Sequence, residues 1–377
     1  MLFQCPLSEL PPKTNLETIR VLKRVNDANR ELAVLKGFAR TIPNQNILVR
    51  ALGLQEAKDS SEIESIITTT DELYRAELFQ SDFISPQTKE VRNYADALFK
   101  GYDLLKQGQV LTANNICAVQ KVLEGNDAGF RKQTGTTLKN AATGEVVYTP
   151  PQNPDDIVRL MGNLAQVINS DEVWPDVDPL IKMAALHYQF ESIHPIYDGN
   201  GRTGRILNVL YLVLKGLLDT PILYLSRYII SHKGEYYRRF QLVREKEDWE
   251  SFVLFMLDAV VETSRMTART VQEIDRAMLE TKRRIRSDFP FYSRDLNEAL
   301  YLYPYTRIGH LQSYLKIARN TAAAYLNKLA AAGILKRVQR GHNVYFVNVR
   351  LFDILSGIPA DADRNTPEII TENTRRS

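Results

Sequence analysis

Residues 194–205 read His-Pro-Ile-Tyr-Asp-Gly-Asn-Gly-Arg-Thr-Gly-Arg, and this stretch decides how the chain around it folds. Its Asp-Gly-Asn-Gly segment favours turns and left-handed backbone, so it cannot lie inside a helix or a strand. The flanking segments 180–193 and 206–214 are apolar at helical spacing. We therefore expect a helix, a tight loop and a second helix that begins where the loop ends.

The loop has the composition of a phosphate-binding site. Successive backbone amides and the positive end of a helix dipole attract anions at such a place. Arg202 and Arg205 fall in the first turn of the second helix, where planar guanidinium groups suit phosphate oxygens. A Walker loop would end in Gly-Lys-Ser/Thr, and a dinucleotide fingerprint would follow a strand. Neither pattern is present, so we expect a different kind of phosphate site.

Two residues of the loop predict chemistry. His194 lies at its mouth, and histidine is the commonest general base near neutral pH. Asp198 beside a polyphosphate is placed to hold Mg²⁺ through oxygen. Together with the arginines, they predict phosphoryl-type transfer from a nucleotide to a hydroxyl. The two residues are four apart, which on a helix would suit zinc, but Pro195 and the glycines exclude a continuous helix. A histidine before a proline could also be only a helix-ending residue, and His187, on the same face of the preceding helix, is expected to be a core histidine.

The dodecapeptide resembles the signature of the Fic family, His-Pro-Phe-x-Asp/Glu-Gly-Asn-Gly-Arg-x-x-Arg, with Ile196 in place of the usual Phe. The resemblance implies a mainly α fold, with a Fic-type helical core and a small β-hairpin flap, that transfers AMP from ATP to a Ser, Thr or Tyr hydroxyl of a protein. It implies that His194 is the base and that Asp198 binds Mg²⁺. It assigns nucleotide binding to Gly199, Asn200, Gly201, Arg202, Gly204 and Arg205, with Arg205 reaching the γ-phosphate. A Fic transferase that uses another donor, such as UMP or phosphocholine, is an alternative.

A second segment, Ser60-Ser61-Glu62-Ile63-Glu64-Ser65, has two interpretations. Ser61 with Glu64 three residues later is typical of a capping box that opens a helix. The segment also resembles the inhibitory helix of many Fic proteins, Ser/Thr-x-x-x-Glu-Gly/Asn, although Ser65 departs from that pattern. The resemblance implies that Glu64 pairs with Arg205 and blocks the γ-phosphate, because a carboxylate can take the place of a phosphate oxygen in an arginine fork. The block could act within one chain or across a homodimer.

Two further features concern the target protein and the adenine ring of the nucleotide. Short β-prone runs around 140–144 predict a hairpin, the flap near 136–149, although a plain loop is the alternative. Its open edge could pair with an extended segment of a target protein, or of this chain itself. Tyr236 and Tyr237 resemble the Fic segment that lines the adenine pocket, although core packing is the commoner use of tyrosine.

The pattern along the chain predicts five regions. The first is an N-terminal helical region at 1–105, with the inhibitory helix near 60–70, and the second is the catalytic core at 106–262. A linking helix at 263–290, a winged helix-turn-helix at 291–358 and a tail at 359–377 follow. We expect two separate helices, at 251–261 and 263–286, before the winged helix-turn-helix. The winged unit resembles the C-terminal extension of many bacterial Fic proteins.

The stretch 305–350 contains eight Lys and Arg residues and no Asp or Glu, in a chain whose net charge is +3. A compact basic region on an otherwise acidic protein is typical of a nucleic-acid surface. We expect five residues to face DNA, namely Arg319, Asn320, Tyr325, Lys328 and Arg340. A protein-interaction or dimerisation module is the alternative. A nucleotide-sensing transcription regulator is therefore a second functional hypothesis, from a different class.

Composition sets the remaining bounds. Hydrophobic residues make up 44% and charged residues 25% of the chain, as in soluble globular proteins. No apolar run reaches the ~18 residues of a membrane span, and the first residues lack the pattern of a secretory signal. Two cysteines, Cys5 and Cys117, give neither a disulfide framework nor a metal quartet. We expect a cytoplasmic protein with no membrane partner.

Overall fold

Short polar residues and prolines set the helix starts in this protein. The computed structural model describes residues 7–78, 85–140, 143–340 and 343–357. The Thr18 side chain accepts a hydrogen bond from the backbone of Val21, and Thr112 forms a reciprocal capping box with Asn115. Each satisfies backbone N–H groups that a helix start leaves unpaired. The chain divides into two compact units, Met1–Asp275 and Arg276–Ser377.

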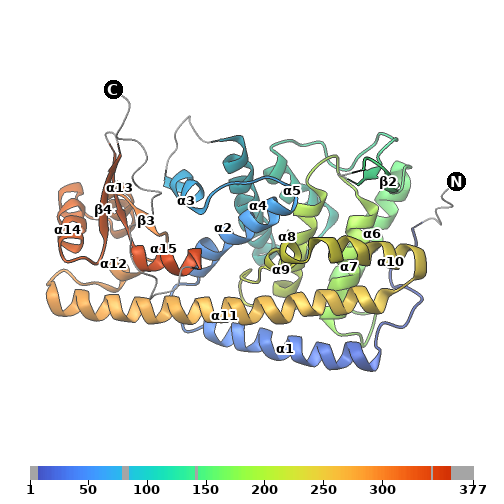
Figure 1. Cartoon of the computed structure of the whole chain (residues 1–377), viewed down its shortest axis with the longest axis horizontal. Coiled ribbons are helices and arrows are strands. Elements are labelled where there is room, and N and C mark those ends of the chain that lie inside the picture. Colours follow the sequence, from blue (N-terminus) through green and yellow to red (C-terminus); the bar gives the residue numbers. More distant parts are fainter. Residues whose placement is uncertain (1–6, 79–84, 141–142, 341–342, 358–377) are drawn as a thin grey trace. The chain divides into compact units, whose positions relative to one another are not determined.

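In the described residues of unit 1, the regular structure is helical apart from one small hairpin (Figure 1). Its helices are α1 (Ile19–Ala39), α2 (Gln45–Ile63), α3 (Thr70–Leu78), α4 (Pro86–Gly108), α5 (Ala113–Glu124), α6 (Pro154–Asn169), α7 (Pro179–Ile193), α8 (Asn200–Leu214), α9 (Leu225–Ser231), α10 (Lys233–Lys246) and most of α11 (Trp249–Asp288). Helix α7 is buried on nearly every side, as expected for a helix that is apolar all round. It packs on α8 and α6, while α4 packs on α2, α5 and α8. The motif thus lies between the two central helices.

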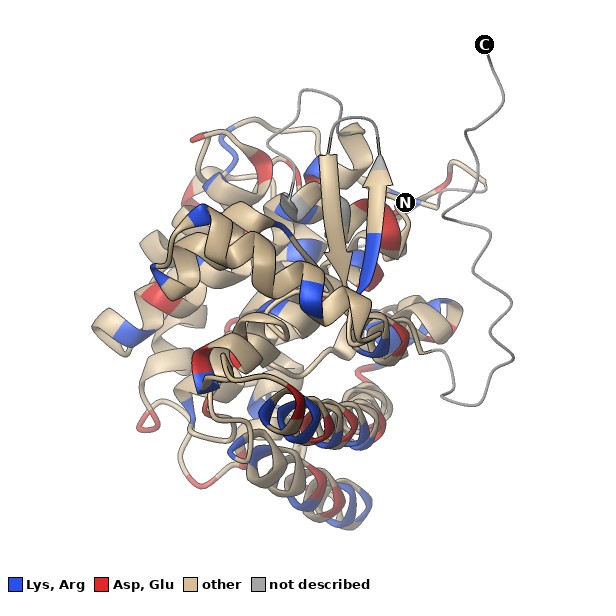
Figure 2. Cartoon of the chain, turned by 90° about the vertical axis from the view of Figure 1, so that its left-hand side faces the viewer, with Lys and Arg blue, Asp and Glu red and all other residues tan. Residues whose placement is uncertain are grey.

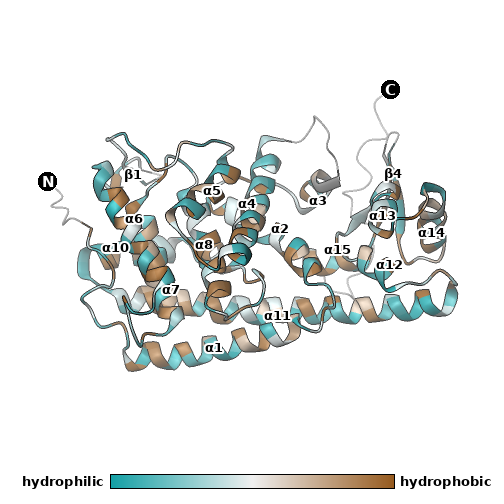
Figure 3. Ribbon diagram, turned by 180° about the vertical axis from the view of Figure 1, so that it is seen from behind, coloured by the Kyte–Doolittle hydropathy of each residue, from teal (hydrophilic) through white to brown (hydrophobic). Residues whose placement is uncertain are grey.

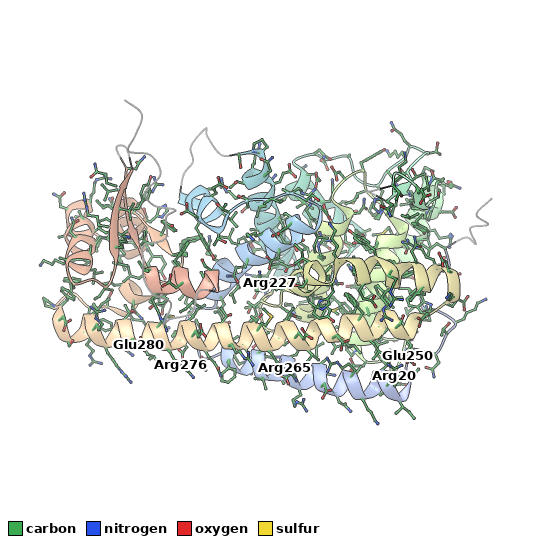
Figure 4. All side chains as sticks on the ribbon, in the orientation of Figure 1. Arg20, Arg227, Glu250, Arg265, Arg276 and Glu280 are labelled. Carbon is green, nitrogen blue, oxygen red and sulfur yellow. The ribbon has the colours of Figure 1, made fainter. Side chains whose placement is uncertain are left out.

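Helix α1 is amphipathic and lies along α11. Figure 3 shows brown and teal turns alternating along α1, and its buried residues recur at Val21, Val25, Ala28, Leu32 and Leu35. Ion pairs of 3.0 Å join Arg20 to Glu250 and Glu31 to Arg265 (Figure 4). These pairs lie at the surface, where each contributes at most about 1 kcal/mol, so the apolar stripe holds the helix.

The expected flap hairpin is confirmed. Strands β1 (Leu138–Lys139) and β2 (Val146–Tyr148) pair antiparallel, with Leu138 opposite Tyr148. Residues 141–142, at the tip, lie outside the described residues. The Tyr148 hydroxyl donates to the carbonyl of Ser192 at 3.0 Å, so the flap is tied to the last turn of α7.

Helix α11 differs from expectation, because it is one helix of 40 residues where we expected two. The expected break near residue 262 is absent. Neither Gly nor Pro is present there, and the Thr263 hydroxyl donates to the carbonyl of Ala259 at 2.6 Å within the helix. The boundary between the two units falls inside this helix.

Unit 2 combines short helices with a three-stranded antiparallel sheet of order β3-β5-β4. Its elements after α11 are α12 (Arg294–Ala299), β3 (Tyr305–Thr306), α13 (Ile308–Leu315), α14 (Arg319–Ala331), β4 (Lys336–Arg340), β5 (Asn343–Val347) and α15 (Val349–Ser356). Strand β3 and helix α15 were not anticipated from the sequence. Figure 2 colours the Lys and Arg residues of these elements blue.

Among the described residues, no helix combines the length and apolar character that crossing a membrane requires.

Candidate functional site

The motif forms the helix–loop–helix that the sequence predicts. His194 ends α7 in the left-handed conformation, with φ +50°, and its N–H donates to the carbonyl of Phe190 at 3.0 Å. Gly199, with φ +76°, is the residue before α8. The Asn200 side chain closes the loop, because it accepts from the backbone N–H of Ile196 at 3.0 Å and donates to the carbonyl of Ile196 at 2.8 Å. Its amide therefore shapes the loop, and Ile196 itself is fully buried.

The first turn of α8 has free backbone N–H groups of the kind that bind anions. No side chain caps this helix, and its first helical hydrogen bond runs from Thr203 N–H to Gly199 O at 2.8 Å. The N–H groups before it have no intrahelical partner and point out of the helix end.

Three motif glycines each face a carboxylate. A Cβ atom added at Gly199 would collide with Glu124, one at Gly201 with Glu64, and one at Gly204 with Glu191. Acidic side chains therefore lie directly against bare backbone, an approach that only glycine allows.

Glu64 joins both motif arginines. Its carboxylate accepts from Arg205 Nη2 at 2.8 Å and from Arg202 Nε at 2.9 Å. Arg205 also donates to the side chain of Ser60 at 2.7 Å and to its carbonyl at 3.0 Å. Burial alone would lower the pKa of Arg205, but the groups around it, with the Glu64 carboxylate the strongest, together outweigh burial and raise the pKa. The expected Glu64–Arg205 contact is confirmed, and the contact with Arg202 is an addition.

Arg202 has further acidic partners that sequence reasoning missed. It is 3% exposed and also contacts Glu124 at 3.0 Å, Glu90 at 3.4 Å and Asp198 at 3.9 Å. Burial raises the pKa of Glu124, although Arg202 opposes this. Glu124 ends α5 and Glu90 lies in α4, so no sequence spacing relates them to the motif.

The location of Glu64 corrects one interpretation of its segment. Ser61 and Glu64 do not open a helix as a capping box, because α2 has run since Gln45 and ends at Ile63. The expected helix near 60–70 is instead the last turn of α2 and the link to α3. Glu64 is the residue after the helix, and Ser65 follows with φ +66°. This is the left-handed position that explains the Gly or Asn of the family pattern.

Helix α2 is held by the segment that follows α8. Glu56 lies four residues before Ser60, on the same face of α2. Its carboxylate accepts hydrogen bonds from the side chain of Ser226 and, at 3.1 Å, from the Tyr94 hydroxyl. Asp59 pairs with Arg227, labelled in Figure 4, at 3.4 Å. The side chain of Lys233 donates to the carbonyl of Ile63. Four contacts thus hold the helix that presents Glu64, three from the segment after α8 and one from Tyr94 on α4.

His194 is a neutral imidazole in this site. Burial first, and then the positive charge of Arg131, lower its pKa to about 4, although the carbonyl of Glu191 and the carboxylate of Glu64 oppose the shift. Its Nδ1 atom is buried and has no hydrogen-bond partner among the described residues. A neutral ring can accept a proton at physiological pH, as a general base must.

Asp198 lies at the open side of the loop. Its side chain is 79% exposed and accepts from the Gly199 N–H at 2.7 Å. In the described part of the chain, no three His, Cys, Asp or Glu residues are grouped to hold a metal. One exposed carboxylate suits Mg²⁺, which keeps several waters and takes its other ligands from phosphates.

The two tyrosines have different environments. Tyr236 is buried against Phe240, with a centroid distance of 5.0 Å, and its hydroxyl bonds His187 at 2.7 Å. His187 is the core histidine that the sequence predicts, also bonded to Asn208 at 3.1 Å. Tyr237 is 50% exposed. Of the two tyrosines, Tyr237 is therefore the one whose ring could contact a nucleobase.

Comparison with known proteins adds to this geometry. Residues 110–212 match the family model "Fic/DOC family", residues 22–103 match "Fic/DOC family N-terminal", and residues 277–351 match "Protein adenylyltransferase SoFic-like, C-terminal domain". Over 113 residues, 30% of this chain, it is 31% identical to a protein adenylyltransferase Fic of Drosophila erecta and 32% identical to one of Aedes aegypti. The chain spans about a fifth of the length of these curated relatives, 21% of each.

Solved structures share the fold. A Fic family protein from Desulfovibrio desulfuricans G20 aligns with a TM-score of 0.58 at 22% identity, covering 90% of this chain and 98% of that one. A Fic domain containing signaling protein from Bacteroides thetaiotaomicron VPI-5482 aligns with a TM-score of 0.51 at 18% identity, covering 66% and 97% of the two chains.

Proposed function

This chain is a Fic domain protein, and from that premise we propose that it is a protein adenylyltransferase, which transfers AMP from ATP to a Ser, Thr or Tyr hydroxyl. The observation that carries the proposal is a neutral imidazole, His194, beside an uncapped helix start with two buried arginines. The names of the curated relatives support the donor group.

The proposed reaction gives each of these groups a role. His194 accepts the proton of the target hydroxyl, whose oxygen forms a bond to the α-phosphorus of ATP. The bond from that phosphorus to the α,β-bridging oxygen breaks, and pyrophosphate leaves. The α8 amides and Arg202 hold the phosphates, and Arg205 holds the γ-phosphate. Mg²⁺, held by Asp198, would neutralise charge on the α- and β-phosphates.

We also propose that Glu64 inhibits the enzyme. Its carboxylate occupies both arginines, so a γ-phosphate must displace a buried, charge-assisted pair before it can bind. Replacing Glu64 with Gly should remove the carboxylate that the two arginines share, whereas Arg202 keeps Glu124 and Glu90 as partners.

The test is label transfer from ATP labelled at the α-phosphate, with the wild type, Glu64→Gly and His194→Ala. We expect Glu64→Gly to raise labelling at least about tenfold, equivalent to about 1.4 kcal/mol. Adding His194→Ala to it should lower the rate by about 10²–10⁴-fold. Labelled UTP and CTP serve as controls for the donor. Undiminished labelling in the His194→Ala variant, or preference for another nucleotide, would contradict the proposal.

The flap is the proposed docking place of the target. Val146 and Val147 are 41% and 39% exposed on β2, an apolar edge that an extended segment could extend. The carbonyl of Val147 accepts from the Gln241 side chain at 2.9 Å, so an incoming strand would replace that bond. Backbone pairing reads little side-chain identity, which leaves a segment of this chain as a candidate target as well.

DNA binding by unit 2 is a second candidate function. Arg319, Asn320 and Lys328 are exposed on α14, within the acid-free stretch 305–350. Tyr325 is less available than we expected, because its ring stacks on Phe291 at 4.1 Å. The side chain of Arg340 lies outside the described residues. The proposal predicts binding to duplex DNA that weakens steeply as salt rises.

A further inference from the structure

Arg131 is a buried cation beside the motif that the reaction described above does not use. It lies between α5 and β1 and is 1% exposed. In the described part of the chain, no ion pair to a carboxylate is present for it, and its hydrogen bonds go to main-chain carbonyls. A buried charge without a carboxylate partner is costly, which indicates that the surrounding structure requires it.

The carbonyls that Arg131 binds belong to the motif turn. Its Nε donates to His194 O at 2.7 Å and its Nη2 to Ile193 O at 3.3 Å, and its own backbone N–H donates to Pro195 O at 2.8 Å. A further bond from Nη2 reaches the carbonyl of Pro151, just after the flap. One residue thus holds three consecutive carbonyls, 193 to 195, at the end of α7.

These hydrogen bonds lie where the backbone is strained. His194 has φ +50°, a left-handed conformation that costs a non-glycine residue about 1–2 kcal/mol. Such a conformation persists when the surroundings over-determine it. The direction of the His194 Cα–Cβ bond, and hence of the ring, depends on this turn. Arg131 also supplies positive charge to the carbonyl end of α7, which favours cations.

The charges around the ring come from several elements. Arg131, from the loop before β1, and Arg244, on α10, disfavour the protonated ring. Glu64, after α2, and the carbonyl of Glu191, on α7, favour it. Arg244 lies over the Tyr148 ring of β2 at 3.8 Å. After burial, the charge of Arg131 is the largest influence that lowers the pKa of His194.

We propose that Arg131 is the positioning residue of His194, because its hydrogen bonds hold the left-handed turn that aims the imidazole. Its unpaired charge, which lies 2.7 Å from the His194 carbonyl, also disfavours the protonated ring. The inference rests on the proposed role of His194 as the base. It separates into a geometric part, which requires the guanidinium fork, and an electrostatic part, which requires only a cation.

The two parts can be tested with Arg131→Met and Arg131→Lys in the Glu64→Gly background, with Lys132→Met as a control that removes a neighbouring exposed cation. The pKa of His194 is measured by NMR on protein with labelled histidine, and its signal is assigned by its loss in His194→Ala. For Arg131→Met we expect the His194 pKa to rise by about one unit or more. The acidic side of the pH profile of AMP transfer should then shift to higher pH by the same amount. For Arg131→Lys we expect an unchanged pKa and a kcat at least about tenfold lower at similar KM for ATP.

Thermal unfolding of each variant shows whether it folds. If Arg131→Met does not fold, Arg131→Lys alone decides: a kcat equal to that of the parent overturns the positioning role. Folded Arg131→Met with an unchanged His194 pKa overturns the electrostatic role. Failure of the proposed function is distinguishable, because transfer would then survive in His194→Ala while the titration still reports on Arg131.

Discussion

Gly199, Gly201 and Gly204 line the start of α8, and each lies against a carboxylate: Glu124, Glu64 and Glu191 in turn. The protein's own acids therefore lie against the bare backbone of the motif. Glu191 is the least explained of the three, since its Oε1 atom has no hydrogen-bond partner in the described part of the chain. Burial raises the pKa of Glu191 to about 7, and Arg205 opposes this.

Glu124 should compete with phosphate at the residue scale. It contacts Arg202 at 3.0 Å above Gly199. In the Glu64→Gly background we predict that Glu124→Gln binds ATP several-fold more tightly, about 1 kcal/mol, because Arg202 loses an acidic partner. Calorimetry measures the affinity, with Glu145→Gln on the exposed flap as the control. Weaker binding would show instead that Glu124 helps to hold the nucleotide or its metal ion.

Ser65 should weaken the hold of Glu64, because a serine at φ +66° is strained. Asn tolerates this conformation better than Ser, so Ser65→Asn should raise the free energy of unfolding by about 0.5 kcal/mol and lower basal transfer. Urea unfolding and label transfer check both effects. Ser65→Ala, which keeps the strain, should not stabilise the protein; equal stabilisation by Ala would rule out this explanation.

At the scale of elements, α2 carries the inhibitory residue and also a buried acid. Burial raises the pKa of Glu56 to about 8, although Ser226 opposes this. The folded state therefore holds a proton that the unfolded chain releases near its ordinary value of 4.5. Because the folded-state pKa is the higher one, the stabilisation is present below pH 4.5 and is lost as pH rises through about 8.

Glu56→Gln should abolish this contribution. We predict that its free energy of unfolding, relative to wild type, rises by up to about 1.4 kcal/mol per pH unit between pH 5 and 8. Urea unfolding at several pH values measures the difference, with the half-exposed Glu62→Gln on the same helix as the control. Parallel pH curves for wild type and Glu56→Gln would contradict the buried, protonated state.

Element boundaries show where local patterns reach their limit. The motif loop was predictable, because Gly199 and Pro195 rule out helix whatever surrounds them. The end of α2 was not, since Ser60 and Ser61 signal a helix start as readily as they fit a helix whose side chains bind Arg205. The continuity of α11 was not predicted either, although neither Gly nor Pro interrupts it, because local patterns alone do not distinguish one long helix from two shorter ones.

At the scale of the whole molecule, the two proposed functions use different residues. The transfer site lies in 1–275, and the basic residues of α14 lie in 276–377. We predict that Arg319→Ala with Lys328→Ala weakens DNA binding and flattens its salt dependence, while transfer by the Glu64→Gly protein is unchanged. Fluorescence anisotropy with a duplex and label transfer measure the two. Asn327→Ala is the control. Salt-independent binding would contradict the DNA proposal.

The sequence by itself determined the loop, its histidine and its arginines, because these are encoded in contiguous residues whose backbone preferences are local. The pairing of Glu64 with Arg205, 141 residues away, was expected only from the resemblance to the family's inhibitory segment, and the tertiary structure forms it. Only the tertiary structure decided what surrounds them. Glu124, Glu90 and Arg131 come from segments 63 to 112 residues away from their partners, and no periodicity links such positions. Burial has the same origin: the neutrality of His194 and the proton on Glu56 arise from packing of helices that are distant in the chain, and pKa values follow the environment rather than the residue type.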